Sequence, residues 1–170
     1  MPFQQGALDS LCGIYSIINA DRIINRTTKE HSQKLFDDII HFLSRKRLLV
    51  DILTEGMFLK HITKILDKVV GVRIPSRELA CRNKSTPDLD TFWTSLEMFL
   101  DDTPGRAVIL GLKGVHDHWT VIERISPKQI DLYDSVSLQR LPRAFCTTMD
   151  IKGKRKHLLR PAQTYFLSGA

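Results

Sequence analysis

Three residues that together support covalent acyl transfer lie far apart in this chain. They are Cys12 near the N-terminus, and His118 and Asp134 in the last third. A cysteine thiolate is a nucleophile, an imidazole serves as its base, and a carboxylate orients the imidazole. The fold has to bring the three together, and the patterns around each of them indicate how.

Cys12 lies where a loop turns into an apolar helix, in the stretch LDSLCGIYSIINA. Apolar residues from Leu11 to Ile24 cover most of the helix circumference, which predicts a helix buried on nearly every side. Asp9 and Ser10 are suitable N-caps, so Cys12 is expected in the first turn, where unpaired N–H groups and the helix dipole favour a thiolate. The alternative is a buried cysteine that packs as a small hydrophobe.

His118 opens the predicted strand HWTVIERI, and Asp134 closes the next one, QIDLYDS. A Ser-Pro turn joins them as a tight hairpin that folds these two ends back beside each other. Ile130, Leu132 and Asp134 share one strand face, so the carboxylate continues an apolar row, and an imidazole partner accounts for its burial. The alternatives are a core histidine with satisfied hydrogen bonds and a turn-forming aspartate.

The other patterns place helices in the first half of the chain and strands in the second. Amphipathic spacing predicts helices that begin near Thr27, Met57 and Thr86, and a strand-like run, VVGVRIP, follows the second of them. After Asp101 the period changes, and RAVILGL and AQTYFLS are predicted as further strands. We therefore expect one α+β domain over residues 1–170, with a helical part over about 8–101 and an antiparallel sheet over about 106–168.

The composition narrows the class of partner. A net charge of +6 favours acidic partners. The densest basic run, KGKRKHLLRP, has no aromatic side chain that stacks on bases, so we expect it to form a solvated loop or else a substrate-steering patch. Only the positive charge favours a nucleic-acid-binding domain, because the sequence contains no recognisable nucleic-acid-binding motif. No stretch has the length of a membrane span, and the N-terminus lacks a secretory pattern, so we expect a cytoplasmic protein with free thiols.

The two histidines of HDH, His116 and His118, are two residues apart, so they could lie on one strand face as two metal ligands would. No third and fourth ligand is near them in the sequence. We therefore expect neither a metal ion nor a cofactor. His116 is expected in the loop before the strand, where it would line the cleft. Trp119 is expected to pack in the core, and Asp117 to be exposed.

The stretch LCGIYSIINA, followed much later by HWTVIE and LYDS, resembles the papain-like cysteine peptidase superfamily. Within that superfamily it is most similar to the compact bacterial branch that contains the bacteriocin-leader peptidases of ABC transporters. The resemblance follows the order of elements over nearly the whole chain, through short motifs. It implies a papain-like fold in which a buried N-terminal helix packs on an antiparallel sheet, with Cys12 as nucleophile, His118 as general base and acid, and Asp134 as the residue that orients the imidazole.

Two positions depart from the family pattern. Leu11 stands where an aspartate is common, directly before the cysteine. The family's oxyanion-hole glutamine is carried over to Gln5, one residue further from Cys12 than usual, with Gln4 as the alternative. Such a donor matters, because the loss of one costs about a hundredfold in rate in a comparable site.

The resemblance implies cysteine-dependent acyl transfer, with hydrolysis of a peptide or isopeptide bond as the first expectation. The same triad serves deamidases, transglutaminases and acyltransferases, among them secreted bacterial effectors that act in a host cell. The second alternative is a catalytically inactive papain-like module that binds peptides. The expected partner is a protein or peptide, with acidic ones favoured by the charge, and residues 55–84 are expected to form the cleft wall that sets specificity.

Overall fold

The computed structural model describes residues 1–6, 9–81, 86–101 and 103–170. Within these ranges it contains five α-helices and a sheet of seven strands, and no helix is long and apolar enough to cross a membrane. The helices are α1 (Cys12–Asn25), α2 (Lys29–Arg45), α3 (Leu49–Glu55), α4 (Leu59–Ile65) and α5 (Leu89–Leu100), with a π-helical turn η1 (Leu66–Val70) and 3-10 turns η2 (Gly71–Arg73) and η3 (Arg143–Phe145). The strands are β1 (Ser76–Leu79), β2 (Arg106–Gly114), β3 (His118–Ile125), β4 (Gln129–Leu132), β5 (Arg140–Pro142), β6 (Cys146–Thr147) and β7 (His157–Ser168).

The strands form one open sheet in the order β1-β7-β2-β3-β4-β5. Neighbours on this path are antiparallel, and the short β6 joins β7 in parallel. The predicted α+β class is confirmed, because the helices and the strands that carry the sheet are largely segregated along the chain. The sheet is thus antiparallel, as predicted, apart from this one short pair.

The region predicted as helical differs from expectation at its end. The run VVGVRIP is not a strand: its first residues continue the helical path through η1 and η2, and Val70 and Ile74 are buried there. A short apolar run fits a buried helix as well as a strand, which explains the wrong prediction. The strand, β1, follows Pro75 and pairs with β7 at the sheet edge, so it interrupts the expected helical part. That part was expected to begin at residue 8, which lies outside the described residues.

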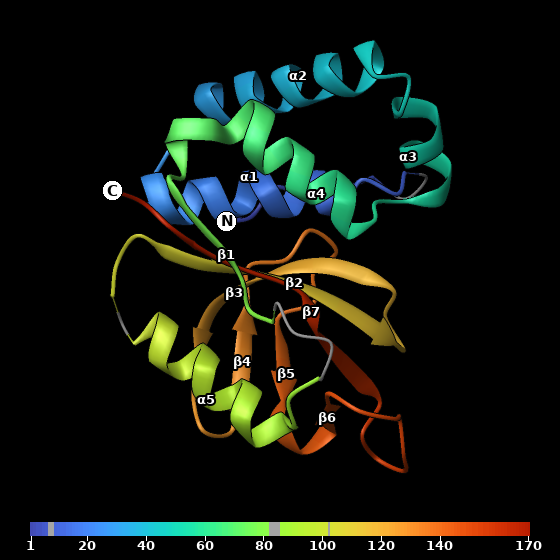
Figure 1. Cartoon of the computed structure of the whole chain (residues 1–170), viewed down its shortest axis with the longest axis vertical. Helices are drawn as coiled ribbons and strands as arrows, with labels where there is room; N and C mark the ends of the chain where they lie inside the picture. Colours follow the sequence, from blue (N-terminus) through green and yellow to red (C-terminus); the bar gives the residue numbers. More distant parts are fainter. Residues whose placement is uncertain (7–8, 82–85, 102) are drawn as a thin grey trace.

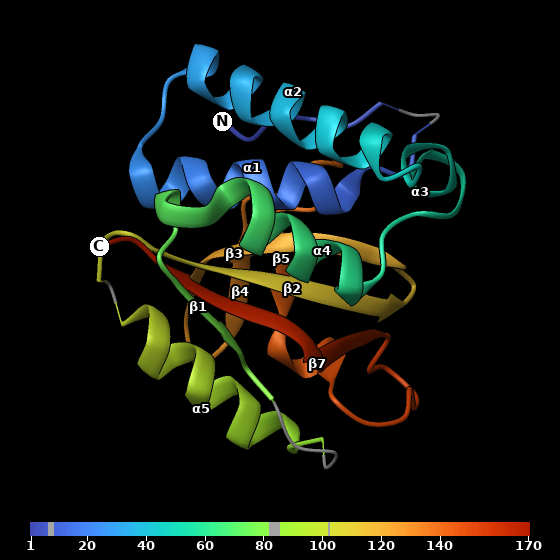
Figure 2. The same cartoon turned by 45° about the horizontal axis from the view of Figure 1, so that its top comes forward.

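The helices cover both faces of the sheet. α1 and α4 lie on one face with α2 outside them, and α5 lies on the other face (Figures 1 and 2). Alternation along β2 supplies both interfaces: Ala107 and Ile109 belong to the core under α1, whereas Val108 and Leu110 belong to the core under α5. α1 is buried on most sides, as its apolar circumference predicted, so its N-terminal end is held firmly against the sheet.

The helix starts lie close to the predicted positions but use other caps. α1 begins at Cys12 with Leu11 as the N-cap residue, and Ser10 is not the cap. Asp9 contributes instead by accepting the Leu11 backbone N–H at 3.1 Å. α2, expected to begin near Thr27, is capped by Thr28, whose side chain accepts the His31 backbone N–H at 3.3 Å. Neighbouring polar residues are nearly equivalent as caps, so spacing alone does not choose between them.

The basic run also has a defined shape. Residues 152–155 form a turn closed by a bridge between Lys152 and Arg155, and the side chains from Lys152 to Lys156 are exposed. The expected solvated loop is confirmed for these residues. The end of the run differs, because Leu159 and Pro161 are buried within β7.

Candidate active site

Three segments distant in sequence meet at one side of the sheet. Cys12 is the first residue of α1, His118 is the first residue of β3, and Asp134 follows β4 by two residues. The turn between β3 and β4 is closed by the Ser126 backbone N–H, which donates to the Gln129 carbonyl at 2.9 Å. The hairpin therefore folds His118 and Asp134 back beside each other, as the sequence predicted.

Asp134 is a buried carboxylate with both oxygens occupied. The His118 Nε2 lies 2.7 Å from Asp134 Oδ1, and the two side chains are 9% and 1% exposed. Asp134 Oδ2 accepts the backbone N–H groups of Val136 at 2.7 Å and of Leu138 at 3.3 Å. Burial would raise the pKa of this carboxyl, but the hydrogen bonds and the charge of His118 outweigh it and hold the pKa below its ordinary value.

His118 lies between this carboxylate and Cys12. Cys12 and His118 line the same cavity, and the interaction of the thiol with the imidazole contributes to the pKa of His118. Burial lowers the pKa of His118, but the hydrogen bonds to Asp134 and Cys12 and their charges outweigh burial and raise it to about 9. An imidazole with that pKa is protonated at neutral pH, and a cation beside a thiol favours the thiolate.

A cavity of about 350 Å³ opens over Cys12 and His118. We call it the Cys12 cavity. Three parts of the chain surround it: the segment before α1, the connection between α3 and α4, and the adjoining strands β2, β3 and β7. Its lining residues are Gln5, Asp9, Ser10, Cys12, Glu55, Gly56, Met57, Phe58, Gly111, Leu112, Lys113, Asp117, His118, Trp119 and Gln163.

Gln5 lines the Cys12 cavity, and Gln4 does not. The Gln5 side-chain amide donates to the Asp9 carbonyl at 2.8 Å, and because its nitrogen carries two hydrogens, the second is left for an oxyanion. Gln4 is exposed, and its amide donates to the Asp134 carbonyl at 3.2 Å. Of the two glutamines weighed from the sequence, the structure brings Gln5 together with Cys12.

Asn19 is a supporting residue that the sequence analysis missed. It is fully buried in α1, where its side chain accepts the Phe3 backbone N–H at 2.9 Å and donates to the Phe3 carbonyl at 3.3 Å. This pair of bonds fixes the N-terminal segment that carries Gln5. A polar side chain within the apolar run of α1 was the available signal, because such a residue needs a partner when buried.

The α3–α4 connection forms one wall of the cavity. The Trp119 indole N–H donates to the Met57 carbonyl at 2.7 Å. On the other side Met57 packs against Gly13, where an added Cβ would lie 2.8 Å from the methionine sulfur, so a glycine is needed beside Cys12. Trp119 is buried, as predicted, and it also lines the cavity. Of residues 55–84, predicted to form a cleft wall, only 55–58 do so, and 82–84 lie outside the described residues.

The neighbours of His118 have other roles. His116 lies in the loop before β3, as predicted, but it does not line the cavity: its ring stacks on His157 with centroids 5.3 Å apart. Asp117 is exposed, as predicted, and pairs with Lys113. In the part of the chain that the structure describes, no group of three or more His, Cys, Asp or Glu side chains is arranged to hold a metal ion.

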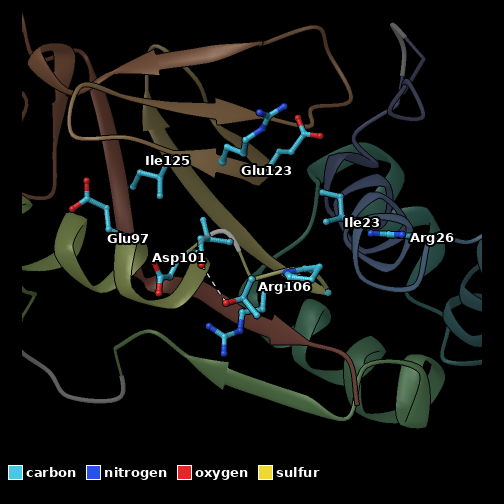
Figure 3. A pocket seen from close by; sticks show the side chains of 12 residues that line it. Ile23, Arg26, Glu97, Asp101, Arg106, Glu123 and Ile125 are labelled. Atoms are coloured by element: carbon cyan, nitrogen blue, oxygen red, sulfur yellow. Dashed lines mark hydrogen bonds between the residues drawn. The ribbon is translucent and has the colours of Figure 1, made fainter.

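A second, larger cavity of about 530 Å³ lies between the end of α1, the end of α5 and strands β2 and β3 (Figure 3). It is lined by basic side chains, Arg26, Arg106 and Arg124, and by acidic ones, Glu97, Asp101 and Glu123. Neither cysteine nor histidine is among its lining residues. The larger cavity therefore lacks the residue types from which covalent chemistry could be built.

Comparisons of the chain with protein-family models, with curated proteins and with solved structures find no match. The function is therefore inferred from the site itself.

Proposed function

We propose that this chain is a papain-like, cysteine-dependent acyl-transfer enzyme whose first reaction is hydrolysis of a peptide or isopeptide bond. One observation supports this most strongly: the buried ring of His118 is hydrogen-bonded to the Asp134 carboxylate, at 2.7 Å, and lines the same cavity as the thiol at the start of α1. A buried histidine that only fills the core needs no second charged partner. An imidazole held by a carboxylate and facing a thiol in a cavity has the arrangement that nucleophilic catalysis requires.

The reaction follows from the positions of these groups. The Cys12 thiolate attacks the carbonyl carbon of the substrate, and the negative charge that develops on oxygen is held by the Gln5 amide and by the Cys12 backbone N–H. That N–H belongs to the first turn of α1, where backbone donors have no intrahelical acceptor. The protonated His118 then gives its proton to the leaving amine, which departs and leaves a thioester on Cys12.

The second half-reaction releases the acyl group. The now neutral His118 takes a proton from a water molecule as that water attacks the thioester carbonyl. The acid product leaves, and the Cys12 thiolate and the His118 imidazolium are restored. Asp134 stays ionised throughout, because its lowered pKa keeps it a carboxylate.

The triad does not select water over other nucleophiles. Attack by an amine or an alcohol on the same thioester gives a transglutaminase or an acyltransferase, and a glutamine side chain as the acyl donor gives a deamidase. A binding module without turnover is the remaining candidate, and it is favoured by Leu11, which stands directly before Cys12 in place of the family's common aspartate. Leu11 is buried and packs in the core under α1, where the family's common aspartate would be costly.

The pH dependence of alkylation by iodoacetamide separates an enzyme from a binding module. Labelling of each cysteine is followed by peptide mass spectrometry in the native chain and in His118→Ala. We expect fast alkylation of Cys12 that persists well below an ordinary thiol pKa and is lost in His118→Ala. An ordinary thiol titration, equal in both proteins, would contradict the enzymatic proposal.

A further inference from the structure

The wall of the Cys12 cavity formed by residues 55–58 has two exposed side chains, Glu55 and Phe58, and the Phe58 ring packs against that of His61 with centroids 5.7 Å apart. Met57 faces inward and fixes the wall to Gly13 and Trp119, as described above. Glu55, the last residue of α3, is exposed, and the structure gives its carboxylate no hydrogen bond or ion pair with any described residue. Phe58 is 57% exposed, although it lies next to the buried Met57. Both side chains line the cavity.

The other charges around the cavity are already compensated. The two carboxylate oxygens of Asp9 accept the backbone N–H groups of Gly6 at 2.8 Å and of Leu11 at 3.1 Å. Asp117 pairs with Lys113, and the charge of His118 faces Asp134. Among the described charged residues of the lining, Glu55 is thus the one with neither a hydrogen bond nor an ion pair, and it is negative although the chain as a whole carries +6.

The Phe58 ring adds a second feature that suits a cation. The face of an aromatic ring attracts ammonium and guanidinium groups. The Nζ atom of Lys60 lies 5.6 Å from the centre of the Phe58 ring, so the ring already attracts a cation from its own segment. Lys60 is exposed and free to be displaced into solvent by a competing cation.

We propose that Glu55 and Phe58 form a subsite for a basic side chain, arginine above all, of a peptide substrate whose reacting carbonyl lies at Cys12. The subsite rests on the acyl transfer proposed above. The Glu55 carboxylate binds the cationic end, and the Phe58 ring packs against the planar guanidinium, which stacks on aromatic faces better than an ammonium does. The general positive charge of the surface steers acidic partners, whereas this subsite selects the residue that enters the cavity.

Matched thiol-directed probes test this subsite. Peptidyl acyloxymethyl ketones are made in pairs that differ only in carrying arginine or its neutral isostere citrulline, at each position beside the reactive carbonyl. The second-order rate of Cys12 labelling is then measured for the native chain, for Glu55→Gln and for Glu123→Gln. Glu123 is exposed and lines the larger cavity, so its variant makes the same change of charge away from Cys12 (Figure 3).

At the best position we expect the arginine probe to react about five- to tenfold faster than its citrulline partner, the size expected for a partly exposed ion pair with a cation–π contact. Glu55→Gln should bring this ratio close to one and leave iodoacetamide alkylation of Cys12 unchanged. Glu123→Gln should keep the ratio. Equal rates for the two probes in the native chain, or a ratio that Glu55→Gln does not change, would overturn the subsite.

Failure of the catalytic proposal gives a different result. In that case iodoacetamide labels Cys12 slowly whether or not His118 is present. The subsite is then tested by reversible binding of fluorescein-labelled arginine and citrulline peptides to Cys12→Ala, measured by fluorescence anisotropy. The same preference for arginine, lost in the added Glu55→Gln, supports the subsite, and equal affinities overturn it.

Discussion

Cys12 and Cys146 are both buried thiols, but their surroundings are opposite. Cys146, in β6, is fully buried in the core under α5, and its thiol donates to the Pro142 carbonyl at 3.4 Å. Burial raises the pKa of Cys146 to about 12, despite the nearby charge of Arg155. Cys12 is 9% exposed and lines a cavity together with His118, whose pKa is raised to about 9 with a contribution from Cys12.

The difference indicates what would be needed to make a small apolar side chain a nucleophile. Burial by itself disfavours the thiolate and makes a cysteine inert. At the start of α1 the same residue type is combined with a cation, an opening to solvent and helix N–H groups. The comparison of the two sites predicts which changes remove chemistry and which change only packing.

The largest effect is expected from the two cysteines themselves. Cys12→Ala removes the nucleophile and should lower the hydrolysis of p-nitrophenyl acetate by about a thousandfold or more. Cys146→Ala should leave this rate nearly unchanged, because its thiol lies in the core. Equal losses in the two variants would show that Cys12 is no more reactive than a core residue.

Gln5→Ala tests the oxyanion hole, with Gln4→Ala as its matched control. Loss of the Gln5 donor should slow ester hydrolysis by about a hundredfold. Alkylation of Cys12 by iodoacetamide should not change, because that displacement forms no oxyanion. Gln4 lies outside the cavity, so its variant should retain both rates. A loss in Gln4→Ala alone would transfer the role to the other glutamine.

The raised pKa of His118 links stability to pH. The folded-state pKa of about 9 lies above the ordinary 6.5, so the protonated form stabilises the fold fully below 6.5, and this stabilisation is lost as the pH rises through 9. From neutral pH to about 9 the unfolding free energy should fall by about 2 kcal/mol. Urea unfolding at a series of pH values measures this fall. His118→Ala should flatten the dependence in this range, and an equal fall in that variant would assign it to another group.

Asp134→Asn should have the smallest kinetic effect, because asparagine keeps an oxygen that accepts the His118 N–H. Loss of the negative charge lowers the His118 pKa, but a fall of one pKa unit from about 9 leaves most of the imidazole protonated at neutral pH, so alkylation of Cys12 there should slow by no more than about twofold. Asp131→Asn, on the same hairpin but half-buried and bonded to Gln129, is the control and should be neutral. The His118 pKa should fall in Asp134→Asn and not in Asp131→Asn, and an equal His118 pKa in both variants would show that Asp134 has no electrostatic role.

The placement of Cys12, His118 and Asp134 at one side of the sheet was predictable because each lies in or beside an element with a strong local pattern. Two local patterns can be recognised without knowledge of distant contacts. One is the apolar circumference of α1, and the other is the alternation of Ile130, Leu132 and Asp134, which places the Asp134 carboxylate on a buried strand face. The hairpin supplied the remaining step, since a tight turn determines which strand ends meet.

Other features depend on contacts between distant parts of the chain. β5 and β6 are only three and two residues long, and β1 is held by its pairing with β7, so periodicity alone gives them little signal. The choice of Gln5 over Gln4 depends on Asn19 and on the backbone carbonyls of Asp134 and Ser135, which fix the N-terminal segment. The wall at residues 55–58 forms because Trp119 and Gly13 hold Met57, and both belong to other elements.

The most direct test of the account is the titration of the His118 imidazole, followed by NMR of the ring-labelled chain and assigned by comparison with His118→Gln. The account predicts a pKa of about 9, which falls in Asp134→Asn and in Cys12→Ser because both partners contribute to the shift. Burial without these partners would lower the pKa instead. A value at or below the ordinary 6.5 would therefore contradict the imidazolium that the proposed mechanism requires.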